Sequence, residues 1–215
     1  MKKPFTLVEV LIAMSVLSVF LLGLMQFYAS TETVLSSGVE RTETFERARI
    51  AMDMMANDLT CIYYSQTDKD MKPFLPINGG SSFQVSTIRP EKLVSGAKTN
   101  IIGVKYELKG DSGSKDLGKL FYSADIKGDT FSVSDATFGK ETELVDGVTK
   151  FEVKPYFDKD NTWCELPAYV VIRLELVDQR TMKRMKANPS VKFDDKKREF
   201  RRMVIIDRGQ PKPEL

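Results

Sequence analysis

Hydrophobic residues at the start of the chain form one long uninterrupted stretch. From Val10 to Tyr28 the sequence reads VLIAMSVLSVFLLGLMQFY and contains no charged residue. An α-helix rises about 1.5 Å per residue, so about 19 residues span roughly 29 Å, close to the hydrocarbon thickness of a bilayer. The pattern predicts a helix of membrane length.

The helical pattern continues beyond this stretch but becomes amphipathic. Steps of three and four place five apolar residues on one face: Phe45, Ala48, Met52, Met55 and Leu59. Arg49 and Asp53 are spaced for an ion pair on the exposed side. We therefore predict one helix from Phe5 to about Tyr64, in which the second half packs on a folded domain.

After a connecting loop at 65–81, strict alternation replaces the helical period. Alternating apolar and polar residues predict half-buried strands in four segments: 83–85, 102–108, 120–126 and 170–176. A turn at 127–130 leads towards Phe131 and Val133, which continue an antiparallel meander.

A second β-group completes the domain. Phe151 and Val153 share one face, Pro155 is placed most easily on a sheet edge, and the last strand is Phe200–Ile206. We expect the helical face from 45 to 59 to cover these sheets. The predicted fold class is α+β, a long N-terminal helix packed on antiparallel β-sheets.

Composition indicates a globular domain with an anchor rather than an enzyme. The chain is 42% hydrophobic and 29% charged, and its net charge of +2 predicts no general attraction to nucleic acid. It contains no histidine, which removes the commonest general base and metal ligand. We expect no catalysis and no cofactor.

Two charged stretches have both a functional and a structural interpretation. Asp158, Asp160, Asn161 and Glu165 offer oxygen ligands for calcium, but they lack EF-hand spacing and its glycine, so a solvated turn is preferred. The stretch 180–202 is rich in Lys and Arg, yet acidic residues interrupt it and no aromatic platform accompanies it. We predict a solvated loop there, with contact to an acidic partner subunit as the alternative.

The chain has two cysteines, Cys61 and Cys164. In an oxidising compartment a disulfide would join the end of the helix to the loop near Trp163, and two separately buried thiols are the alternative. Closing a loop of about 100 residues would stabilise the fold by a few kcal/mol.

Glu9 is the unusual residue of the apolar helix, a carboxylate about one turn from its start. A charge at mid-membrane costs about 2.5–3.5 kcal/mol, so such a residue usually has a partner. Lys2 and Lys3 precede it and favour a cytoplasmic N-terminus. Taken alone, Glu9 is either a partly hydrated interfacial residue or the partner of a cation.

The sequence around Glu9 closely resembles the N-terminal signature of type IV pilins and type II secretion pseudopilins. Residues 5–13, FTLVEVLIA, follow a basic leader and combine an aromatic residue, a glutamate four positions later and an apolar helix. The resemblance implies that prepilin peptidase removes residues 1–4, that Phe5 becomes an N-methylated N-terminus, and that Glu9 meets the amine of a neighbouring subunit. The family usually has glycine before the cut; here it is Pro4, and we expect cleavage between Pro4 and Phe5.

Later segments are similar to the J-type minor pseudopilin of type II secretion systems. These are Leu144–Val148 before Phe151, a turn at 158–163, and Arg198–Arg202 running into an apolar strand. The middle of the chain, 65–140, carries no motif of that family. The resemblance runs from one end of the chain to the other and is strongest in residues 5–13 and from Glu143 onward.

The resemblance implies a single-pass protein of the bacterial inner membrane with its C-terminal head in the periplasm. Residues 1–4 would be the leader, 5–30 the transmembrane and assembly helix, and 31–215 the head. The implied partners are the I-type and K-type minor pseudopilins, the major pseudopilin, and the inner-membrane assembly platform. A minor subunit of a type IV or DNA-uptake pilus, and a solitary membrane-anchored binding domain, are the alternatives.

Overall fold

A computed structural model describes residues 6–65, 71–91, 93–111, 114–157, 166–188 and 196–206 of the chain. The chain divides into two compact units, residues 1–42 and residues 43–215. The first contains the apolar part of a long helix, and the second contains the end of that helix together with a β-sheet.

The long helix α1 (Leu7–Thr60) is continuous and confirms the prediction of a single N-terminal helix. It ends where the Cys61 N–H donates to the Asn57 carbonyl at 3.0 Å. The chain then becomes extended, and Ile62 forms an antiparallel bridge with Thr87. The β-forming residues after Cys61 therefore end the helix about four residues before the predicted boundary.

Seven antiparallel strands form one sheet in which the strand order follows the sequence order. The strands are β1 (Phe74–Ile77), β2 (Ser82–Ile88), β3 (Ile101–Asp111), β4 (Ser114–Ala124), β5 (Thr142–Tyr156), β6 (Tyr169–Leu176) and β7 (Arg198–Ile205). The 3-10 turns η1 (Asn78–Gly80) and η2 (Val133–Asp135) and the helix α2 (Gln179–Ala187) complete the elements. The two predicted β-groups are one sheet, because β4 pairs with β5 from Gly118↔Val148 to Tyr122↔Thr142.

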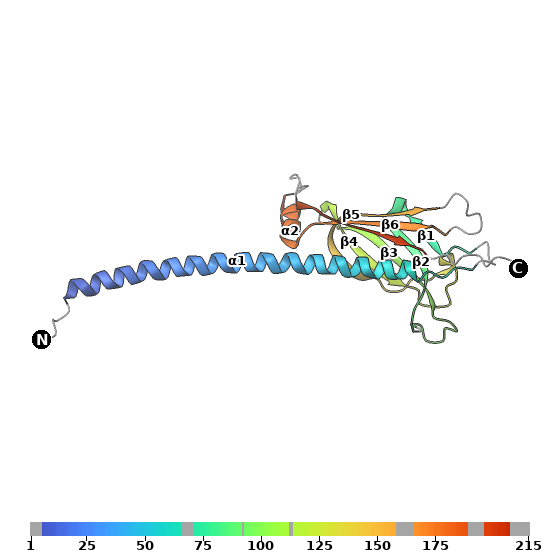
Figure 1. Ribbon diagram of the computed structural model, residues 1–215, viewed down its shortest axis with the longest axis horizontal. Helices are drawn as coiled ribbons and strands as arrows, with labels where there is room; N and C mark the ends of the chain where they lie inside the picture. The colour runs from blue at the N-terminus through green and yellow to red at the C-terminus, as the bar shows by residue number, and fades with distance from the viewer. Residues whose placement is uncertain are drawn as a thin grey trace. The chain divides into compact units, whose positions relative to one another are not determined.

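The second half of α1 lies against one face of this sheet (Figure 1). The predicted helical face is confirmed: Phe45 packs against the core, and Ala48, Met52, Met55 and Leu59 are at most 5% exposed within it. The alternation predicted for β6 is also confirmed, because its inward residues are fully buried: Val170, Ile172, Leu174 and Leu176. The fold is therefore mixed α+β, an apolar N-terminal helix followed by an antiparallel sheet.

Pro155 occupies the position that the sequence predicts. The pairing of β4 with β5 ends at Val148, so among the described strands the part of β5 that contains Pro155 pairs with β6 alone. Proline lacks an N–H donor, and an unpaired side of a strand accommodates it without the loss of a ladder hydrogen bond.

Three expectations about a loop, a strand and an ion pair are wrong. The loop predicted at 65–81 contains strand β1, whose Pro76 lies on the outermost strand. Phe131 and Val133 do not form a strand, because Val133 enters the turn η2 and its N–H donates to the Lys72 carbonyl at 3.0 Å. Asp53 pairs with Arg202 of β7 instead of Arg49.

The basic stretch after β6 begins with the short helix α2 rather than a solvated loop. The Asp178 side chain caps this helix by accepting the Thr181 N–H at 2.7 Å. Met182 and Met185 are buried against Leu117 and Val177, while the Lys and Arg residues of α2 face solvent. Helical spacing therefore gives this basic segment one buried face.

Candidate assembly site on the apolar helix

Helix α1 begins with a reciprocal contact between Thr6 and Glu9. The Thr6 N–H donates to Glu9 Oε2 at 3.1 Å, and Thr6 Oγ1 donates to the same oxygen at 3.2 Å. The Glu9 N–H in turn donates to Thr6 Oγ1 at 3.3 Å. This is a capping box, which satisfies two N–H groups that a helix start leaves without partners. Sequence analysis singled out Glu9 but missed Thr6, although the Thr-x-x-Glu spacing was the signal for it.

The Glu9 carboxylate keeps room for another donor. Both hydrogen bonds from Thr6 end on Oε2, and no residue that the structure describes donates to Oε1. The side chain is exposed at the first turn, where the positive end of the helix dipole favours a negative charge. Glu9 can therefore cap its own helix and accept a cation from outside at the same time.

The apolar part of α1 is exposed along its whole length. The most apolar 18 residues within 7–36 have a mean hydropathy of 2.5, and residues 7–36 are all exposed. Within the described part of the chain, one helix is both long enough and apolar enough to cross a membrane. This finding is consistent with single-pass anchoring. Exposing a large aliphatic side chain to water costs about 1.5–3 kcal/mol, so this surface requires lipid or other apolar helices.

The serine hydroxyl groups within the apolar stretch are satisfied by their own helix. Ser15 Oγ donates to the Leu11 carbonyl at 2.9 Å, and Ser18 Oγ donates to the Met14 carbonyl at 2.8 Å. These bonds remove the need for polar partners in an apolar medium. Glu9 and Glu32 are the charged residues at the two ends of the stretch, with no charge between them.

At its other end, α1 is held to the sheet by a buried polar network. Asp58 is fully buried and accepts a hydrogen bond from the Tyr106 hydroxyl at 2.6 Å. Arg89, just after β2, donates through Nη2 to Asp58 Oδ2 at 2.9 Å and lies 2.7 Å from Oδ1. Tyr106 also stacks on Phe83 with ring centroids 5.0 Å apart. One carboxylate thus connects the helix to β3 and to the end of β2.

Burial controls the protonation of this network. It raises the pKa of the Asp58 carboxyl above its ordinary value, although the Tyr106 hydrogen bond and the Arg89 charge act in the opposite direction. Burial, and then the Asp58 charge, raise the pKa of the Tyr106 hydroxyl well above its ordinary value. Both effects follow from the cost of placing a charge in an apolar core. The arrangement fixes the helix and offers no open reactive group.

Several predicted site residues lie outside the described residues: Pro4, Phe5, Cys164 and the acidic segment 158–165. Cys61 lies half-buried immediately after α1. Because Cys164 is outside the described residues, the disulfide between the two stays a prediction. Within the described ranges, no three Cys, Asp or Glu side chains come together as a metal site would require.

The chain matches no protein-family model, and no curated protein sequence matches it.

Proposed function

We propose that this chain is a J-type minor pseudopilin, a structural subunit at the tip of a type II secretion pseudopilus. In this role it helps to start fibre assembly and protein export across the outer membrane. The observation that carries the proposal is α1: one continuous helix has an exposed apolar part, a carboxylate at its first turn and, from 45 to 59, one face packed in the core of the head. The resemblance of residues 5–13 to the pseudopilin signature supports the same role.

The exposed apolar surface of α1 suits both environments that such a subunit occupies. In the inner membrane, residues 7–36 contact lipid, and the head lies in the periplasm. When the assembly platform extracts the subunit, the same side chains pack on helices of the major pseudopilin and of the I-type and K-type subunits. Transfer from lipid to apolar neighbours carries little hydrophobic cost.

Glu9 would provide the polar contact of assembly. Removal of residues 1–4 by prepilin peptidase turns the Phe5 nitrogen into an amine next to the capping residue Thr6. The amine of one subunit would pair with Oε1 of Glu9 on its neighbour, since Oε2 already holds the Thr6 bonds. Because an unpaired carboxylate is costly in an apolar fibre core, the contact favours assembled over isolated helices.

The mass of the intact purified protein tests the processing step. We expect a chain that begins at Phe5 and carries one added methyl group. A chain that retains Met1 in working fibres would contradict the proposal, because Glu9 would then lack the amine.

Replacing Glu9 tests its charge separately from its capping role. Glutamine keeps the capping hydrogen bonds and removes the charge, whereas alanine removes both. We expect Glu9→Gln and Glu9→Ala to insert into the membrane normally and to reduce incorporation into fibres by at least about tenfold, the size of a lost coupling of about 1.4 kcal/mol.

The matched control is Glu32→Ala, which removes the carboxylate at the other end of the apolar stretch and should assemble normally. Normal assembly of both Glu9 variants would contradict the Glu9 contact, and absence of the wild type from fibres would favour a solitary membrane-anchored binding domain. The secretin that co-purifies with the protein distinguishes a type II secretion subunit from a minor subunit of a type IV or DNA-uptake pilus.

A further inference from the structure

The two outer strands of the sheet differ in how well they are protected from further pairing. β1 has four residues and contains Pro76, and short strands and prolines are features that obstruct a sheet edge. β7 has eight residues and no proline, and it pairs with β6 in unbroken register from Tyr169↔Ile205 to Leu176↔Arg198. The main chain of β7 is therefore straight enough to accept another strand.

The hydrogen bonds of β7 show which residues face its free edge. The Ile206 N–H donates to the Ala168 carbonyl at 3.0 Å, so even-numbered residues of β7 direct their main-chain groups towards β6. Arg201, Met203 and Ile205 consequently direct theirs to the opposite side. In the part of the chain that the structure describes, no strand pairs with that side.

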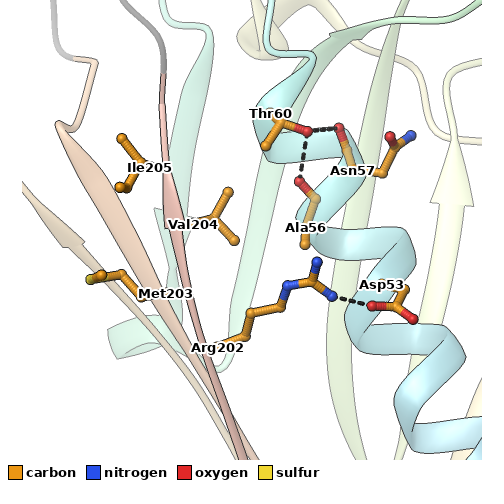
Figure 2. A pocket seen from close by; sticks show the side chains of 8 residues that line it. All are labelled: Asp53, Ala56, Asn57, Thr60, Arg202, Met203, Val204 and Ile205. Atoms are coloured by element: carbon orange, nitrogen blue, oxygen red, sulfur yellow. Dashed lines mark hydrogen bonds and ion pairs between the residues drawn. The ribbon is translucent and has the colours of Figure 1, made fainter.

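A groove runs along β7 between the strand and α1 (Figure 2). It has a volume of about 570 Å³ and is lined by Asp53, Ala56, Asn57 and Thr60 of α1 and by residues 202–205 of β7. Figure 2 shows Val204 on the helix side of the strand and the Arg202–Asp53 ion pair spanning the groove. Met203 and Ile205 are 60% and 69% exposed. The free edge thus has an apolar end and a helix beside it.

The charges along β7 are not balanced. Glu199 pairs with Arg173 at 2.8 Å, and Arg202 pairs with Asp53. Arg198 and Arg201 form no ion pair with any residue within the described ranges. Among the described residues, the edge therefore has positive charge without an acidic partner at one end and exposed apolar side chains at the other.

We propose that the free edge of β7 binds an extended acidic segment of a partner protein, which adds to the sheet as an eighth strand. Main-chain hydrogen bonds to residues 201, 203 and 205 supply the pairing, and carboxylates of the segment meet Arg198 and Arg201. In symmetric antiparallel pairing of a second copy, the registers centred on Arg201 or Arg202 place like charges opposite each other, whereas an acidic segment places carboxylates opposite these arginines. Phe5 and Glu9 take no part, so the inference stands apart from the proposed function.

The test uses the full chain in detergent micelles and a labelled peptide, acetylated and amidated, of sequence VTVEETTE. In antiparallel pairing its glutamates lie opposite 202, 201 and 198, and its valines lie opposite 205 and 203. The matched peptide VTVKKTTK reverses the charge only. Fluorescence anisotropy should give saturable binding of the acidic peptide, at least about tenfold tighter than that of the basic one.

Three variants identify the binding surface. Met203→Pro removes an N–H that faces the free edge and leaves the β6 ladder intact, so it should abolish peptide binding. Met203→Ala keeps the N–H and should change the dissociation constant by less than about threefold. Arg201→Glu should remove most of the preference for the acidic peptide, because only the contact with Arg198 then remains favourable. Thermal unfolding shows whether each variant folds. If Met203→Pro does not fold, hydrogen exchange of the wild-type amides at 201, 203 and 205, measured with and without peptide, replaces it as the test.

Tighter binding of the acidic peptide, its loss in Met203→Pro, and slowed exchange at the three amides would support the proposal. Absence of saturable binding, equal affinity for both peptides, or unchanged binding by a folded Met203→Pro would overturn it. A concentration-dependent dimer of the wild type that Met203→Pro abolishes would assign the edge to a second copy and would also overturn it.

Discussion

At the scale of single residues, the carboxylates of this chain are distinguished by their donors. Asp125 accepts hydrogen bonds from the N–H groups of Lys127, Gly128 and Thr137 and so holds the turn after β4. Asp58 is buried between a guanidinium and a phenol, whereas Glu9 is exposed and has an oxygen to which no described residue donates. The contacts of Asp125 and Asp58 stabilise the fold, and of these three carboxylates Glu9 is the one open to another molecule.

The Tyr106 hydroxyl should contribute measurably to stability. Tyr106→Phe leaves the stacked ring in place and removes a donor from a buried carboxylate, so we expect a loss of about 1.5–3 kcal/mol in the free energy of unfolding. Urea denaturation followed by circular dichroism measures it. Tyr156→Phe, which removes a hydroxyl from a 40% exposed ring, is the control, and equal losses in both variants would contradict the assignment.

Asp58 should make stability depend on pH in a defined direction. Its folded-state pKa is raised, so the folded state binds the proton more tightly than the unfolded state. The protonated Asp58 carboxyl therefore contributes its whole stabilisation below the ordinary carboxyl pKa. This stabilisation is lost as the pH rises through the raised folded-state pKa of Asp58. We expect the advantage of the wild type over Asp58→Asn to be larger near pH 3 than near pH 7 in urea titrations. An advantage that grows with pH would show that Arg89 and Tyr106 outweigh burial.

At the scale of elements, α1 presents different surfaces to different surroundings along one continuous helix. Met55 is fully buried against the sheet, whereas Ile50, on the same stretch, is 64% exposed. We expect Met55→Ala to destabilise the head by about 2–5 kcal/mol, because a cavity remains in a close-packed core. Ile50→Ala should change stability by less than about 0.5 kcal/mol. Comparable effects in urea denaturation would contradict the observed orientation of the helix.

Periodicity predicted the elements that have long regular patterns. The face from Ala48 to Leu59 and the alternation in β6 are visible in the sequence because packing repeats at every turn or every second residue. β1 was missed because Pro76 weakens a strand signal, although an outermost strand tolerates it. α2 was missed because only Met182 and Met185 mark its apolar face within a basic segment.

The candidate site was predictable only where its residues are close in sequence. Glu9 was identified from its spacing of four residues from Phe5. Its partner Thr6 could have been identified from the Thr-x-x-Glu spacing of a capping box. The Asp58 network could not be predicted, because Arg89 and Tyr106 lie 31 and 48 positions away and only the fold brings them to one carboxylate. The groove beside β7 likewise depends on which strand is outermost, and a strand pattern does not contain that information.

At the scale of the whole molecule, the division into two units predicts that the head folds without the apolar helix. Every buried residue of the main core lies at or after Ala48. We expect a chain that starts at Glu43 to be soluble and to unfold cooperatively, while the full chain partitions into membranes. Cell fractionation and thermal unfolding measure the two properties.

A shorter chain that starts at Cys61 makes this test specific. It lacks the helical face that covers the sheet, including Met52, Met55 and Leu59, and it also lacks Asp58. The inward residues of β6 would then be exposed to water, so this chain should aggregate or remain unfolded although it keeps every strand. Cooperative unfolding of the shorter chain would show that the sheet is stable alone, and failure of the longer one to fold would show that the head needs the first 42 residues.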